Sequence, residues 1–248
     1  MLELTVGGWV LAVIAAASVG LAKGGLAMVG MISVPVLSLV MSPVQAAGLM
    51  LPIYVVSDVG GLLAFRRNFD MRVLATALPG ALAGIGIGWA GAHVVPVDGV
   101  TFIVGAVGLI FALNALIRPP LKDERRFPSY ARGTGWGLLS GYTSFVSHAG
   151  APPWQIYVQP LRLSALTYAG TTTWFFAVCN WVKLIPYAAL GQLSPGNLRA
   201  AAVLMPVALL SVWAGLRLVK IIPEALFYKL ITWGLLAVSL RLIWQALA

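Results

Sequence analysis

The feature that most constrains the fold of this chain is a succession of apolar segments, each long enough to cross a lipid bilayer as a helix. Continuous segments cover 44–65, 71–93, 97–117, 164–187, 197–218 and 223–246, whereas 5–41 and 133–161 are apolar but interrupted by glycine, proline and polar residues. A helix needs roughly 20 apolar residues to span a hydrocarbon core about 30 Å thick. Hydrophobic residues make up 60% of the 248 positions and charged residues only 9%. We therefore predict an all-α polytopic membrane protein.

The distribution of charge indicates which loops face the cytoplasm. The net charge is +9, and 8 of the 16 lysines and arginines fall within 66–72 and 118–132. Basic residues concentrated in loops are typical of the cytoplasmic side of a membrane protein. No soluble basic region is present that would bind nucleic acid, so we exclude that partner. The single cysteine, Cys179, has no partner for a disulfide, and neither a metal nor a cofactor is expected.

The order of the segments suggests an internal duplication, because each half begins with an interrupted segment that is followed by three regular ones. The register that sets 41–48 on 163–170 also brings Asp58 opposite Asn180. We predict two transmembrane repeats, residues 1–117 and 133–248, joined by a cytoplasmic linker at 118–132. After a five-residue gap, further matches are Arg72 with Arg199, Pro79 with Pro206, Gly88 with Gly215 and Pro96 with Pro223.

The loop charges indicate that the two repeats are inverted relative to each other. The basic loop 66–72 corresponds in the second half to the uncharged loop 191–197, and the next loop there carries Arg217 and Lys220. By the positive-inside rule, both termini then lie outside, in the periplasm if the membrane is a bacterial inner membrane. Each interrupted segment would be a re-entrant hairpin or a pair of short spans. Inverted repeats with broken helices are typical of secondary transporters whose site lies between the halves.

The first interrupted segment places a lysine between small residues at membrane depth. Lys23 precedes Gly24 and Gly25, and Pro35 follows in the same segment. A broken helix with a free N-terminus beside Lys23 would attract an anion. Two alternatives stay open: the glycines can serve helix packing, and Lys23 can extend its amine to the membrane interface.

Polar residues in the second half complete the set of candidate substrate contacts. His148 lies in the second interrupted segment, Thr171 and Thr172 follow a repeated glycine, and Asn180 is in the middle of 164–187. Hydroxyl, imidazole and amide groups can donate hydrogen bonds to the oxygens of an anion. Alternatively, His148 is a hydrogen-bonded interior histidine, and the threonines bond the backbone of their own helix.

Asp58 is the candidate for coupling or for an ion pair. A buried carboxylate is costly unless it is paired or protonated. Asp58 can carry a coupling proton, or it can pair with a basic residue such as Lys183 or Lys23. A purely structural pair is the alternative.

Several of these motifs resemble those of the TauE/SafE-type sulfite exporter family, the TSUP transporters. The resemblance rests on Gly20-Leu-Ala-Lys-Gly-Gly-Leu26, Val34-Pro-Val-Leu37, Pro43-Val-Gln-Ala-Ala-Gly-Leu-Met-Leu-Pro52, Asp58, Arg66-Arg-Asn-Phe-Asp70 and the Gly170-Thr-Thr run. It spans essentially the whole chain and implies a bacterial inner-membrane carrier of sulfite or organosulfur anions. Ser147-His148-Ala-Gly150 and Pro152-Pro153 depart from the glycine-rich form that is usual in the second interrupted segment.

The function we expect is secondary transport of a small sulfur-containing anion, with membrane lipid as surroundings and a proton or another ion as possible coupling partner. Carriers of other organic anions, such as carboxylates, are the main alternative. An intramembrane enzyme is disfavoured because neither a Gly-x-Ser-x-Gly nor a His-Glu-x-x-His pattern is present. A scaffold and a channel are further alternatives, which ligand-dependent stability and saturable flux would distinguish from a carrier.

Overall fold

The computed structural model describes residues 5–24, 26–92, 94–117, 126–218 and 224–248, and over these residues the chain is helical, without strands. Five of its helices are long and apolar enough to cross a membrane: 6–23, 43–63, 71–92, 97–117 and 195–215. The prediction of an all-helical membrane protein is confirmed. Residues 118–125 of the expected linker lie outside the described residues. The helix after it begins at Tyr130, so 130–132 of that linker already belong to the helix.

The helices follow the same order in the two halves of the chain. The first half consists of α1 (Val6–Lys23), the 3-10 helix η1 (Ala27–Ile32), α2 (Ser33–Leu37), α3 (Pro43–Ala64), α4 (Met71–Ala92) and α5 (Val97–Ile117). The second half consists of α6 (Tyr130–Ser147), α7 (Ala151–Val158), the 3-10 helix η2 (Gln159–Leu161), α8 (Ala165–Ala189), α9 (Pro195–Leu218) and α10 (Glu224–Leu247). In each half a long helix is followed by a short broken one and then by three long helices.

Local sequence explains where several helices begin. Ser42 and Ser164 are the N-caps of α3 and α8, and each hydroxyl accepts a hydrogen bond from the backbone N–H three residues later. Asp70 precedes α4, and its carboxylate accepts from the backbone N–H of Arg72 and Val73. Caps of this kind satisfy amides that have no partner within the helix.

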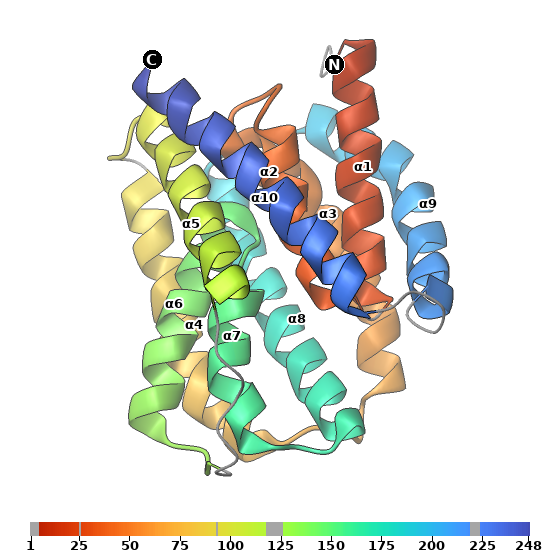
Figure 1. The fold of residues 1–248 in the computed structure, drawn as a ribbon, viewed down its shortest axis with the longest axis vertical. Coiled ribbons are helices and arrows are strands. Elements are labelled where there is room, and N and C mark those ends of the chain that lie inside the picture. The colour runs from red at the N-terminus through yellow and green to blue at the C-terminus, as the bar shows by residue number, and fades with distance from the viewer. Residues whose placement is uncertain (1–4, 25, 93, 118–125, 219–223) are drawn as a thin grey trace.

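The helices from the two halves interlock. Helix α4 packs along α6, α9 packs along α1, and α5 packs along α10. Figure 1 shows both termini at the same end of the bundle, and it shows α3 and α8 running in opposite directions. The buried core includes residues of both halves, among them Leu49, Met50, Trp154, Phe175 and Leu204.

Glycines set the distance between α4 and α6. A Cβ added at Gly80 or Gly84 of α4 would collide with the backbone of α6, and one at Gly137 or Gly141 of α6 would collide with the backbone of α4. The two backbones are therefore in direct contact, as small residues allow between transmembrane helices. The residues near the C-terminal end of α6, among them Ser144 and Ser147, are buried.

Candidate functional site

The first polar group of the interior joins α1, α3 and α8. Lys23, the last residue of α1, forms an ion pair with Asp58 of α3. The other oxygen of the Asp58 carboxylate accepts a hydrogen bond from the side-chain amide of Asn180, 2.6 Å away. Asp58 is completely buried, whereas the Lys23 side chain is 20% exposed. Asp58 thus contacts Lys23, one of its two candidate ion-pair partners, and Asn180, its equivalent in the second repeat.

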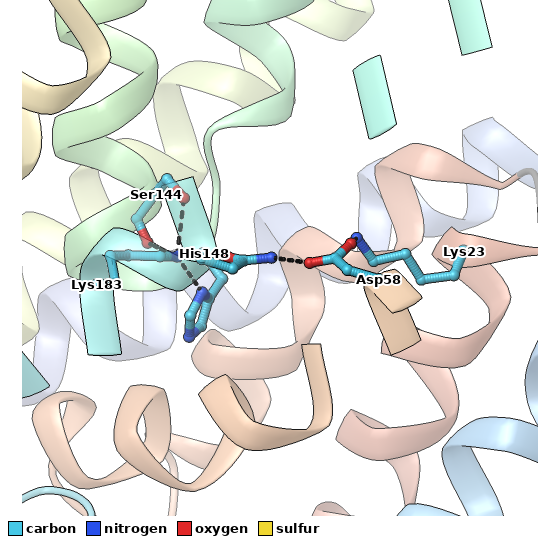
Figure 2. A network of polar contacts seen from close by, with 6 residues as sticks. Lys23, Asp58, Ser144, His148 and Lys183 are labelled. Atoms are coloured by element: carbon cyan, nitrogen blue, oxygen red, sulfur yellow. Dashed lines mark hydrogen bonds and ion pairs between the residues drawn. The ribbon is translucent and has the colours of Figure 1, made fainter. Parts of the chain in front are cut away.

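The second polar group joins α8 to the end of α6. Lys183 is completely buried, and its Nζ lies 3.0 Å from the backbone carbonyl of Ser144, 3.0 Å from the Ser144 hydroxyl and 2.8 Å from Nδ1 of His148. None of these three partners is a carboxylate. Figure 2 shows this group beside the Lys23–Asp58 pair.

The hydrogen bonds of His148 indicate its tautomer. Its Nε2 lies 3.0 Å from the backbone carbonyl of Ala47, which can only accept, so Nε2 carries the proton. In a neutral imidazole Nδ1 then accepts from Lys183. Three acceptors around Nζ match the three N–H groups of a lysine ammonium. The arrangement therefore suits a charged Lys183 beside a neutral His148.

Tyr54 lies between the two groups. Its ring is 4.6 Å from the ring of His148 between centroids, and the Nζ of Lys23 lies 5.6 Å from its centroid. Its hydroxyl donates to the backbone carbonyl of Gly30 at 2.9 Å and lies 3.2 Å from the Ser33 hydroxyl. Tyr54 thus fixes the broken segment η1–α2 against the site.

Both lysines interact at the C-terminal ends of helices, where the helix dipole favours positive charge. Lys23 ends α1, and Lys183 binds the Ser144 carbonyl near the end of α6. Among the described residues, Lys23 contacts Asp58 and the face of Tyr54, and no helix N-terminus of that part of the chain is among its contacts. Helix α6 ends because His148 takes a left-handed conformation, with φ of 53°, and prolines at 152 and 153 open α7.

Other predicted site residues lie apart from these groups. The Thr171 hydroxyl donates to the Thr167 carbonyl and accepts from the backbone N–H of Asp70, so it joins α8 to the loop before α4. The Thr172 hydroxyl accepts from the indole of Trp154. Gly24 caps α1, and Gly25 lies outside the described residues. The alternative that a threonine bonds its own helix backbone fits Thr171.

Two residues of the site, Ser144 and Tyr54, were not among the predicted contacts. Tyr54 lies one helical turn before Asp58, and Ser144 one turn before His148, so each shares a face with a predicted residue. This spacing of one helical turn is the feature of the sequence from which Tyr54 and Ser144 could have been predicted. The contacts themselves depend on how α3, α6 and α8 cross.

The site thus contains two amines, one carboxylate, one amide, one imidazole and the hydroxyls of Ser144 and Tyr54 within a bundle of apolar helices. In the part of the chain that the structure describes, no group of three or more His, Cys, Asp or Glu side chains is placed to hold a metal ion. With both amines protonated, the site has one positive charge more than the Asp58 carboxylate balances, and this excess favours the binding of an anion.

A family model described as sulfite exporter TauE/SafE matches residues 10–242. The chain belongs to the TauE/SafE sulfite exporter family. The resemblance based on the lysine-glycine and arginine motifs is therefore confirmed. Comparisons with curated proteins and with solved structures found no match.

TauE/SafE proteins form a family of membrane transporters, and the five apolar helices agree with a location in a membrane. In this TauE/SafE chain the polar groups come from both halves: Lys23 and Asp58 from the first, and Ser144, His148, Asn180 and Lys183 from the second. A site of this kind suits an anion more than a neutral substrate.

Proposed function

We propose that this chain is a secondary carrier of a small sulfur-containing anion, sulfite or an organosulfonate, in the bacterial inner membrane. The observation that supports it best is Lys183, a completely buried amine that contacts no carboxylate of the described residues. A charge inside a membrane bundle is expensive and usually marks a substrate or ion pathway. A bound anion would supply the missing negative charge.

The anion would bind between the two polar groups. Lys23, Lys183 and the Asn180 amide would donate hydrogen bonds to its oxygens, with the Ser144 hydroxyl close by. Asp58 competes for Lys23 and Asn180 in the described state. Binding of the anion and release of Asp58 from Lys23 would therefore accompany each other, and a protonated Asp58 would favour the exchange. We propose Asp58 as the site of coupling to a proton.

The transport mechanism we propose is alternating access between inverted repeats. Three pairs of corresponding features support it. Ser42 and Ser164, which are equivalent in the repeat register, cap corresponding helices. Gly20 of α1 meets the carbonyl of Ala208, and Gly141 of α6 meets that of Ala81. Ala81 and Ala208 are equivalent in the register that matches Pro79 with Pro206. Helices α3 and α8 run in opposite directions.

The proposal is tested by the thermal stability of the purified protein with sulfite, sulfate, thiosulfate, sulfoacetate, taurine and small carboxylates. A ligand that binds only the folded state at 100 times its Kd stabilises it by about 2.7 kcal/mol. We expect one or a few sulfur anions to raise the melting temperature. Stabilisation by carboxylates alone would contradict the sulfur-containing substrate and indicate a carboxylate. An unchanged melting temperature with every anion would contradict anion transport.

Lys183→Met is expected to abolish that response while the protein melts at the same temperature or higher. The substitution removes a buried amine that no carboxylate within the described ranges contacts, and it keeps a side chain of similar length. Uptake of the stabilising anion into proteoliposomes should fall to background. An unchanged melting shift in Lys183→Met would exclude Lys183 from the site.

The inverted topology predicts which positions an impermeant maleimide reaches from outside. In a Cys179→Ala background, cysteine at Val94 or Pro195 should be labelled in intact cells. Both positions are exposed, and the end of α4 and the start of α9, which they adjoin, lie at the end of the bundle that carries the termini (Figure 1). Cysteine at Arg67 or Phe127 should be labelled only after permeabilisation. A labelling pattern that places Val94 and Pro195 on opposite sides of the membrane would contradict the inverted arrangement of the two repeats.

A further inference from the structure

A pocket lies at the end of the bundle that carries both termini, directly beside the polar groups. It is formed by the start of α3, the end of α4, the start of α5, the later turns of α6 and the end of α8. It is open on one side, and its cavity volume is about 50 Å³. None of the described residues that line it is charged. They include Ala47, Gly91, Val100, Phe145, Tyr187 and Gln192.

The pocket and the polar site share part of their walls. The Ala47 carbonyl accepts the hydrogen bond of His148, and the Tyr187 ring lies 6.2 Å from the ring of His148 between centroids. Lys183 lies one turn before Tyr187 on α8, a rise of about 6 Å along the helix. The apolar pocket therefore begins one helical turn from the unneutralised amine.

We propose that this pocket is a subsite for the hydrocarbon part of an organic anion whose charged head is received by Lys183. The inference rests on the proposed function and narrows its substrate class to amphiphilic anions, such as short alkanesulfonates or alkanecarboxylates. An inorganic oxyanion carries no apolar surface, and an uncharged apolar wall offers it no compensation for lost water. A hydrocarbon chain gains from the same wall because its burial removes apolar surface from water.

Tyr187 and Phe145 form the boundary between the two parts. Tyr187 is only 3% exposed, and its hydroxyl donates to the Phe145 carbonyl. The two rings are 5.2 Å apart between centroids in an edge-to-face arrangement. A head group that reaches Lys183 from the pocket passes this pair. To donate to the anion, the Tyr187 hydroxyl must first release the Phe145 carbonyl, because it has a single O–H.

The length of the hydrocarbon chain is the property that tests the proposal. We would measure the Kd of the full-length protein in lipid nanodiscs for sulfite and for the linear series from methanesulfonate to hexanesulfonate. Each buried methylene is expected to lower the Kd by about fourfold, until the chain fills the pocket. Hexanol, which has the same chain without the charge, is the ligand control.

Two substitutions on α4 give a matched pair of variants. Gly91 lines the pocket, Gly86 does not, and at both positions an added Cβ meets no heavy atom within 4 Å. Gly91→Leu should remove the dependence of the Kd on chain length. Gly86→Leu should behave as the unmodified protein. If Gly91→Leu lowers the yield of folded protein, Val100→Phe replaces it as the test variant, because its side chain fills the same pocket from α5.

Each outcome decides the proposal. Equal Kd values along the series, with sulfite bound, would overturn the subsite and leave the anion carrier standing. No binding of any anion would overturn both. Hexanol binding as tightly as hexanesulfonate, and equally in Lys183→Met, would show a pocket for neutral apolar molecules such as lipid chains and would also overturn it. A chain-length dependence that Gly91→Leu abolishes supports it.

Discussion

Asp58→Leu is expected to lower the free energy of unfolding by about 3–5 kcal/mol and to abolish anion transport. Asp58 is completely buried and accepts from both Lys23 and Asn180. Its removal leaves an amine and an amide in the interior without their acceptor, and the loss of one partner of a buried ion pair has an effect of about this size. Denaturant titration in detergent micelles measures the stability, and proteoliposome uptake measures transport.

The double variant Lys23→Met, Asp58→Leu separates stability from function. Because both charges are gone, we expect it to regain most of the lost free energy of unfolding, except for about 1–3 kcal/mol for the Asn180 amide, which still lacks its acceptor. Transport should stay at background, since Lys23 is a proposed anion contact. A double variant as unstable as Asp58→Leu would contradict the ion pair as the source of the loss. Recovered transport would remove both residues from the mechanism.

Gly141→Ala is expected to prevent the chain from reaching its native packing. A Cβ at this position would overlap the backbone carbonyl of Ala81, and neither backbone can yield without separating α4 from α6. Overpacking of even one methyl group commonly costs about 1–3 kcal/mol, and here the obstacle is main chain. We expect loss of the monodisperse species in size-exclusion chromatography.

Gly135→Ala is the matched control on the same helix. An added Cβ there meets no heavy atom within 4 Å. Alanine in place of a helical glycine favours the helix by up to about 1 kcal/mol, so we expect equal or slightly higher stability. A normal elution profile for Gly141→Ala, or equal losses in both variants, would contradict the close contact of α4 and α6.

Much of the site was recognisable in the sequence because polar residues are conspicuous among apolar ones. Lys23, Asp58, His148, Asn180 and Lys183 all contribute to the two polar groups. Their positions within spans were sufficient, since a polar side chain inside a membrane needs a partner. Which partner each would find was not predictable. Lys23 and Lys183 were equal candidates to pair with Asp58.

For Thr171, the sequence did not predict the partners of the side-chain hydroxyl. Its position after a repeated glycine suggested a substrate contact, but its hydroxyl bonds Thr167 and the loop residue Asp70. Thr171 lies nine residues before Asn180, about 13 Å along α8 at 1.5 Å per residue. Depth along a helix depends on where the helix begins, and Ser164 determines this as the N-cap.

The sequence by itself determined the membrane helices, their order and the list of interior polar residues, because length, hydropathy and helix caps are local properties. Only the tertiary structure decided that Lys23 meets Asp58 while Lys183 meets Ser144 and His148. Those contacts depend on close approach of backbones at glycines and on the left-handed turn at His148, which orient side chains from helices far apart in the chain.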